Sequence, residues 1–171
     1  MGKEKLQELR ALLSPFHKKE FYEFNKYCLQ IPKGSILQIY GPGKTEIALE
    51  LFNEYNEWPV AWVEKTFSFY PPLLLQKKLS YEKFLFVESF SKNKDSTAQI
   101  LLQILKSQLF KAVVVYHDHF DFKQLRRFQI FAEKSESVLI WLAPEKKAEW
   151  PVSTYIDAQK EHCKFRIQKL S

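Results

Sequence analysis

The spacing of apolar residues near the N-terminus predicts helices. Between Lys3 and Leu13 the leucines recur at helical intervals, and Ser14-Pro15 is a typical start for a second helix that reaches Tyr27. We therefore expect an N-terminal helical appendage over residues 1–33.

From Ser35 onward, short apolar runs alternate with amphipathic segments. The expected strands are 36–40, 59–64, 84–87, 112–116, 138–142 and, at an edge, 163–170. The expected helices are 44–55, 71–79, 97–110 and 122–134. The uninterrupted apolar run at 112–116 is typical of a strand buried on both faces. Residues 34–171 are thus predicted to form one α/β domain with a mostly parallel central sheet between two helical layers.

Composition limits the cellular location and the classes of partner that we expect. The longest apolar runs fall far short of the roughly 20 residues of a membrane span, so we expect no membrane insertion. Cys28 and Cys163 are too few and too far apart for a disulfide framework or a zinc cage, which favours a reducing cytoplasm. The net charge of +6 is concentrated at the two ends of the chain, and no basic run marks a nucleic-acid arm. DNA contact stays possible on charge alone.

A glycine-rich turn between the first predicted strand of the domain and its helix is the strongest local motif. It reads Gly41-Pro42-Gly43-Lys44-Thr45. In a P-loop, backbone N–H groups at such a turn surround phosphate, Lys meets the β and γ phosphates, and Thr meets Mg²⁺. That pattern has four residues between its first Gly and the Gly-Lys pair, whereas here Pro42 stands alone. Because the turn is short and proline has no N–H, we expect a vestigial nucleotide site without a bound cofactor such as Mg-ATP.

Three segments carry a family resemblance. The sequence IPKGSILQIYG at 31–41, the strand at 59–63 and the helix DFKQLRRFQIFAE at 121–133 resemble RecA-like P-loop proteins, in particular the bacterial ImuA/SulA-like group. The resemblance implies a three-layer RecA-like core. It also implies a role in SOS-linked mutagenic DNA repair, as an accessory of a translesion polymerase complex. In the SulA branch it implies inhibition of cell division through the septal GTPase.

The acidic residues that ATP hydrolysis requires are displaced. An ATPase of this class needs an acid at the end of the strand at 112–115 to hold Mg²⁺, and a Glu beyond the second strand to orient water. Tyr116 takes the first position and Asp118 follows two residues later, while Glu64 is the only acid near the second. We expect Glu64 and Asp118 to be solvated residues at strand ends. We therefore expect no catalytic residue and no enzyme activity.

Two histidines flank Asp118, and this pair could clamp a metal ion from an extended segment. The sequence offers no third ligand nearby, so we expect ordinary loop histidines and no metal site.

The helix at 122–134 presents a basic face. At 100° per residue, one side gathers Lys123, Arg126, Arg127, Ile130 and Lys134. The other side gathers Phe122, Leu125, Phe128, Phe131 and Ala132. The basic side is either a solvated outer face or an interface for a protein or DNA, and the sequence leaves both open.

The aromatic segment Phe67-Ser68-Phe69-Tyr70 follows the second strand. A loop this apolar must be packed or covered, so Phe67, Phe69 and Tyr70 either fill the core or form a partner loop.

Together these features predict a non-catalytic RecA-like accessory protein that works through a protein partner, such as a polymerase accessory or a RecA-type protein. An ATP-binding protein or ATPase of recombination, and a SulA-like division inhibitor, are the alternatives.

Overall fold

The structure is a computed structural model that describes residues 20–89, 96–147 and 150–159. Its strands are β1 (Phe21–Phe24), β2 (Leu29–Pro32), β3 (Ile36–Tyr40), β4 (Val60–Glu64), β5 (Phe84–Glu88), β6 (Ala112–Tyr116), β7 (Val138–Ala143) and β8 (Thr154–Asp157). Its helices are α2 (Lys44–Glu54), α3 (Pro72–Gln76), α4 (Ser96–Ser107) and α5 (Phe122–Ser135), with 3-10 turns η2 (Asn25–Tyr27) and η3 (Tyr81–Lys83).

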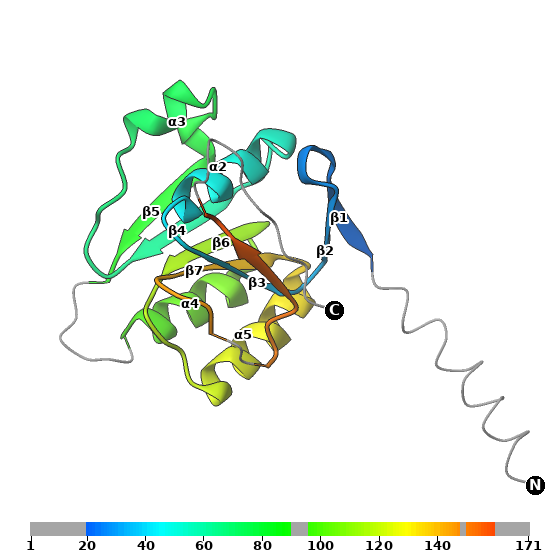
Figure 1. Cartoon of the computed structure of the whole chain (residues 1–171). Coiled ribbons are helices and arrows are strands. Elements are labelled where there is room, and N and C mark those ends of the chain that lie inside the picture. Colours follow the sequence, from blue (N-terminus) through cyan, green and yellow to red (C-terminus); the bar gives the residue numbers. More distant parts are fainter. Residues whose placement is uncertain (1–19, 90–95, 148–149, 160–171) are drawn as a thin grey trace, which may run out of the picture.

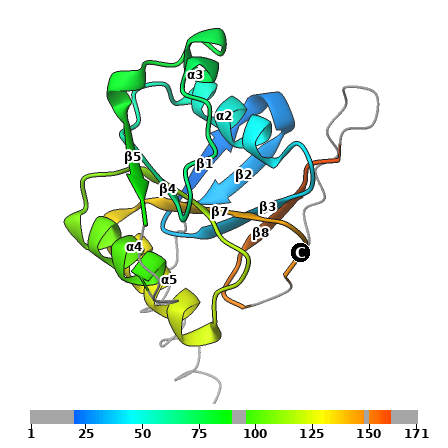
Figure 2. The same ribbon diagram turned by 90° about the vertical axis from the view of Figure 1, so that its left-hand side faces the viewer.

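A six-stranded sheet forms the centre of the molecule, in the order β5-β4-β6-β7-β3-β8. Every pair of neighbouring strands in this sheet is parallel. Helix α2 lies on one face, and α4 and α5 lie side by side on the other (Figures 1 and 2). This arrangement confirms the predicted α/β class with a parallel sheet and supports three layers.

Two apolar cores explain why the sheet is covered on both sides. Alternate residues of β4 point in opposite directions, so Trp62 joins the core under α2, whereas Ala61 and Val63 join the core under α4 and α5. All three side chains are 0% exposed. The uninterrupted apolar runs of β4, β6 and β7 are therefore the sequence of strands that have no solvent face.

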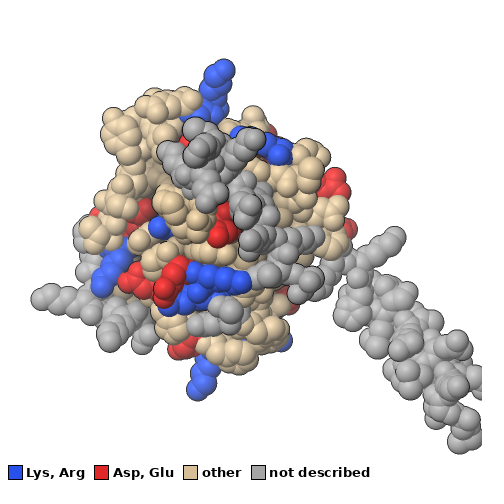
Figure 3. All heavy atoms as spheres, in the orientation of Figure 1, with Lys and Arg blue, Asp and Glu red and all other residues tan. Residues whose placement is uncertain are grey.

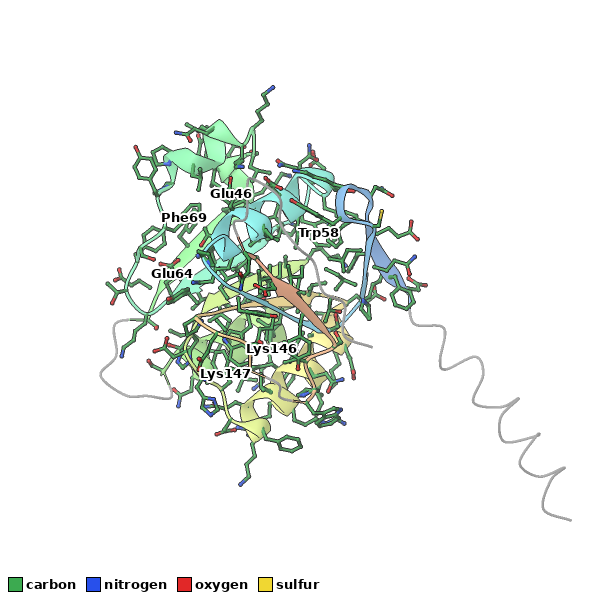
Figure 4. All side chains as sticks on the ribbon, viewed as in Figure 1. Glu46, Trp58, Glu64, Phe69, Lys146 and Lys147 are labelled. Atoms are coloured by element: carbon green, nitrogen blue, oxygen red, sulfur yellow. The ribbon has the colours of Figure 1, made fainter. Side chains whose placement is uncertain are left out.

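The described part of the predicted appendage is an antiparallel β-hairpin, β1 and β2. The prediction of a helix reaching Tyr27 is wrong over Phe21–Phe24, which form β1. Tyr22 packs edge-on against Trp58, with ring centroids 4.5 Å apart, and Trp58 lies between α2 and the hairpin (Figure 4). The hairpin thus contributes to the core under α2.

Two further predictions concern the ends of the chain. The helix expected over residues 3–13 and the edge strand expected at 163–170 lie outside the described residues. The edge position next to β3 is taken by β8, a strand that the sequence pattern did not predict. Within the described segments, no helix has both the length and the apolar character that a membrane crossing requires.

Candidate functional site

The glycine-rich turn joins β3 to α2, as predicted. Gly41 has a φ of +95°, a left-handed conformation that favours glycine. A Cβ atom at Gly41 would lie 3.1 Å from the carbonyl oxygen of Ala158. Gly43 precedes α2, and Lys44 and Thr45 are the first two residues of that helix. The turn therefore keeps the strand-turn-helix context of a P-loop.

The turn is closed by the segment at the end of β8. The Gly43 N–H donates to the carbonyl oxygen of Ala158 at 3.0 Å, and the Ala158 N–H donates to the carbonyl oxygen of Tyr40 at 2.8 Å. We call Asp157–Ala158 the latch segment. Phosphate binding uses free backbone N–H groups at such a turn, and the latch segment has engaged the Gly43 N–H.

The latch segment also brings a carboxylate to the turn. The Oδ1 atom of Asp157 is buried and has no hydrogen-bond partner among the described residues. It lies 3.3 Å from the position that a Cβ atom at Gly41 would take. Burial raises the pKa of Tyr40, and the Asp157 carboxylate raises it further. A phosphate brought to this turn would meet an acidic group, so the residues present do not fit a nucleotide.

Lys44 contacts the aromatic ring of Tyr116 at the end of β6. The Lys44 Nζ atom lies 5.1 Å from the centre of the Tyr116 ring, a cation–π distance. Tyr116 ends β6, where an ATPase of this kind would have its acidic residue. The Lys44 amine is therefore directed to a ring rather than toward a bound phosphate.

Glu64 is a structural residue in this fold. Its side chain is 3% exposed, which corrects the expectation of a solvated strand end. Its carboxylate accepts hydrogen bonds from Trp62 Nε1 at 2.8 Å, from the Ser68 N–H at 2.6 Å and from Ser68 Oγ at 2.9 Å. Figure 4 shows Glu64 and Phe69 on the same side of the molecule. These donors occupy the carboxylate that would otherwise orient an attacking water.

A cavity of about 720 Å³ opens at the carboxyl ends of β4 and β6. Its walls come from the turn after β4, the first turn of α4, and the loop between β6 and α5. The lining residues are Lys65, Thr66, Ser68, Ser96, Thr97, Ala98, Tyr116, His117, Asp118, His119, Phe120, Asp121 and Gln124. Carboxyl ends of parallel strands are where open α/β sheets place ligands.

The two histidines of the β6–α5 loop are joined by a hydrogen bond. The His117 ring stacks on Phe120 with centroids 4.4 Å apart, and its Nδ1 accepts the His119 N–H at 3.2 Å. Burial lowers the pKa of His117. Asp118, between them, is exposed, as expected. Among the residues that the structure describes, no group of three or more His, Cys, Asp or Glu side chains could hold a metal ion.

The basic face of α5 lies at the surface. Lys123, Arg126, Arg127 and Lys134 are exposed, whereas Ile130 is half-buried. The helix begins with a capping box, in which Asp121 accepts the Gln124 N–H and Gln124 accepts the Asp121 N–H. Leu125, Phe128 and Ala132 are buried on the opposite side, as predicted. Across the face of the molecule in Figure 3, acidic and basic side chains are interspersed, without a broad area of one sign.

Phe122 differs from its predicted place on the buried side. It is the first residue of α5, and its side chain is 57% exposed. Its ring stacks on that of Trp150, a residue that the sequence did not single out. Trp150 lies in the loop between β7 and β8, so no helical or strand periodicity in the sequence indicates its position.

The aromatic segment after β4 divides between core and surface. Phe69 is 7% exposed and stacks on Phe86 at 5.2 Å, and Phe67 meets the edge of Phe86 at 5.3 Å. Tyr70 is 65% exposed. Phe67 and Phe69 thus fill space under the loop, and Tyr70 alone of the three faces solvent.

Comparison with known proteins supports the fold. No family model matches the chain, and no curated protein sequence matches it. The crystal structure of SulA from Pseudomonas aeruginosa is similar to it, with a TM-score of 0.51 and 11% sequence identity. The match covers 64% of this chain and 98% of that chain. The likeness supports a SulA-like α/β fold.

Proposed function

We propose that this protein is a non-catalytic member of the RecA-like ImuA/SulA group, and that it acts by binding a protein in SOS mutagenesis and translesion DNA repair. The observation that carries the proposal is the bond from the Gly43 N–H to Ala158, with the Asp157 carboxylate beside it. Because the Gly43 N–H already donates to the protein's own backbone, it is not free to bind a phosphate of Mg-ATP. The resemblance of 31–41 and 121–133 supplies the repair context.

Nucleotide binding and turnover test the loss of catalysis. We expect calorimetry with Mg-ATP to give a Kd no better than about 1 mM, which corresponds to about 4 kcal/mol of binding, and no phosphate release. Lys44→Ala should behave as wild type in both measurements. Micromolar binding, or turnover that Lys44→Ala abolishes, would identify the protein as an ATPase and overturn the proposal.

A cellular assay tests the repair role. A host lacking this protein should show fewer damage-induced mutations after ultraviolet light, at unchanged growth without damage. Complementation with wild type should restore mutagenesis, and Lys44→Ala should restore it equally. Unchanged damage-induced mutation in the deletion strain would contradict a role in translesion repair.

A SulA-like division inhibitor is the second candidate, and the structural likeness to SulA favours it. In that case, expression should make cells filament, and the purified protein should block polymerisation of the septal GTPase. The partner would be that GTPase rather than a polymerase accessory or a RecA-type protein. Normal cell length on expression would exclude this candidate.

A further inference from the structure

An exposed aromatic pair lies beside the basic residues of α5. Phe122 is 57% exposed and Trp150 is 58% exposed. Their rings stack with centroids 5.3 Å apart and an interplanar angle of 27°. The Arg126 guanidinium carbon lies 5.2 Å from the centre of the Trp150 ring. Two large rings at the surface leave apolar area in water, an arrangement typical of an interaction site.

This surface is held in place by its own contacts. Arg126 Nη1 donates to Gln129 Oε1 at 2.8 Å, and Gln129 Nε2 donates to Glu133 Oε1 at 2.9 Å. The capping box at Asp121 fixes the first turn of α5, on which Phe122 sits. A surface whose side chains are already ordered loses little conformational entropy when a partner binds.

We propose that Phe122, Trp150 and Arg126, with the exposed Lys123 and Arg127, form a docking surface for an acidic protein segment that carries one apolar anchor side chain. We call these five residues the aromatic-basic patch. The exposed edges of the two rings receive the anchor, and the cations pair with carboxylates on either side of it. Trp and Arg are the residue types that contribute most binding energy at protein interfaces. The inference rests on the proposed function, because it takes protein binding as the mode of action.

The surroundings favour a protein over single-stranded nucleic acid. Nucleic acid needs free ring faces for its bases and a continuous track of cations for its phosphates. The Trp150 ring already contacts Phe122 and Arg126. Along the chain, exposed Asp118 and Asp121 precede the three cations of the patch, and exposed Glu133 and Glu136 follow them, so acidic residues flank this group on both sides. Such a group of cations next to apolar rings matches a few carboxylates around one anchor.

Fluorescence anisotropy with a designed peptide tests the proposal. The probe is a fluorescein-labelled peptide with a Leu-Trp pair between Glu-Asp pairs. One matched peptide replaces the acids by Gln-Asn, and another replaces Leu-Trp by Ser-Ser. Wild type should bind the acidic anchored peptide at least about tenfold more tightly than either matched peptide, and added salt should weaken the binding.

Variants of the chain assign that binding to the patch. Trp150→Ala and Arg126→Gln should each weaken it about tenfold or more. Lys134→Gln, at the far end of the same helix face, should change it less than about twofold, as should Tyr70→Ala, which removes an exposed ring elsewhere. Circular dichroism checks that each variant is folded. If Trp150→Ala does not fold, the binding result for Arg126→Gln decides whether the patch binds the peptide.

Three results would overturn the inference. The first is that wild type fails to bind the acidic anchored peptide. The second is that folded Trp150→Ala and Arg126→Gln variants bind it as tightly as wild type. The third is that oligo(dT) binds through Trp150 and Arg126 instead. The last result would make the surface a nucleic-acid site. These outcomes can be told apart from a failure of the proposed function, since a chain that lacks ATP turnover and supports mutagenesis yet fails to bind the peptide overturns the docking surface alone.

Discussion

Glu64 holds the turn after β4 through a carboxylate that is almost fully buried, so we expect its loss to reduce stability. Glu64→Ala leaves the Trp62 Nε1–H and the Ser68 N–H without their acceptor. We expect the free energy of unfolding to fall by about 2 to 4 kcal/mol, measured by urea denaturation. Trp62→Phe removes one of those donors. The double variant should therefore cost less than the sum of the two single variants.

An exposed glutamate provides the control. The Glu57 side chain is 82% exposed and forms a surface ion pair with Lys83 at 3.3 Å, so Glu57→Ala should change stability by less than about 0.5 kcal/mol. Equal stability of Glu64→Ala and Glu57→Ala would show that the Glu64 hydrogen bonds contribute nothing.

His117 gives the fold a defined pH dependence. Burial is the main cause that lowers its pKa below the usual 6.5. In mildly acidic solution the unfolded chain binds a proton at this residue before the folded chain does. The contribution of His117 is therefore fully present above pH 6.5 and decreases as the pH falls below that value through the folded pKa.

Thermal unfolding at a series of pH values checks this expectation. The Tm of wild type should fall between pH 7 and pH 5, and His117→Asn should show a smaller fall over the same range. Identical slopes for the two proteins would mean that the half-buried His117 imidazole is not the group responsible.

Among the elements, the β1–β2 hairpin is joined to the rest of the fold by burial on one side. Phe24 is 2% exposed and Ile31 is 0% exposed, and both belong to the core under α2. Its turn is also fixed by Glu54, whose carboxylate accepts the N–H groups of Asn25 and Lys26 at 2.7 and 3.0 Å. The hairpin is therefore part of the folded unit rather than a detachable appendage.

Alanine substitutions on the two sides of β1 test this integration. Phe24→Ala should reduce the free energy of unfolding by about 3 to 5 kcal/mol, because it leaves a cavity between the hairpin and α2. Phe21→Ala removes a ring of the same size that is 44% exposed, and should cost much less. Similar denaturation midpoints for the two variants would contradict the burial of one side of β1.

The pattern of apolar residues predicted five of the six strands of the central sheet, and it missed β8 and the separate β1–β2 hairpin. β6 and β7 are runs of apolar residues with no polar face, which only a strand covered on both sides requires. β1 is ambiguous, because Tyr22 and Phe24 alternate as in a strand while Phe21, Phe24 and Tyr27 also recur at helical spacing. β8 is four residues long and gives no usable periodicity.

On the scale of the whole molecule, the chain brings two distant segments to one site. The turn after β3 and the latch segment are over a hundred residues apart in sequence, yet they share the hydrogen bond from Gly43 to Ala158. The sequence alone predicts the shortened turn, because the P-loop pattern is local. The sequence does not predict that the latch segment closes the turn, since this depends on β8 pairing with β3.

The closed turn predicts that nucleotide does not stabilise the fold. With a Kd of about 1 mM, 1 mM Mg-ATP adds only RT ln 2, about 0.4 kcal/mol. For a chain of this size the Tm should therefore rise by no more than about 2 °C, measured by differential scanning fluorimetry with Mg²⁺ alone as reference. A rise of about 5 °C or more would show that nucleotide binds this protein.

The latch segment has a consequence for reversion. Lengthening the turn after Gly41 to the full P-loop spacing would still leave the Asp157 carboxylate beside the turn. Removing that carboxylate alone would still leave a turn with too few N–H groups. Neither change alone would let the turn bind a nucleotide. Selection for nucleotide binding would therefore not favour either change when it occurs alone. Two coupled changes, a longer turn and a different residue at position 157, would be needed before this turn could hold a phosphate.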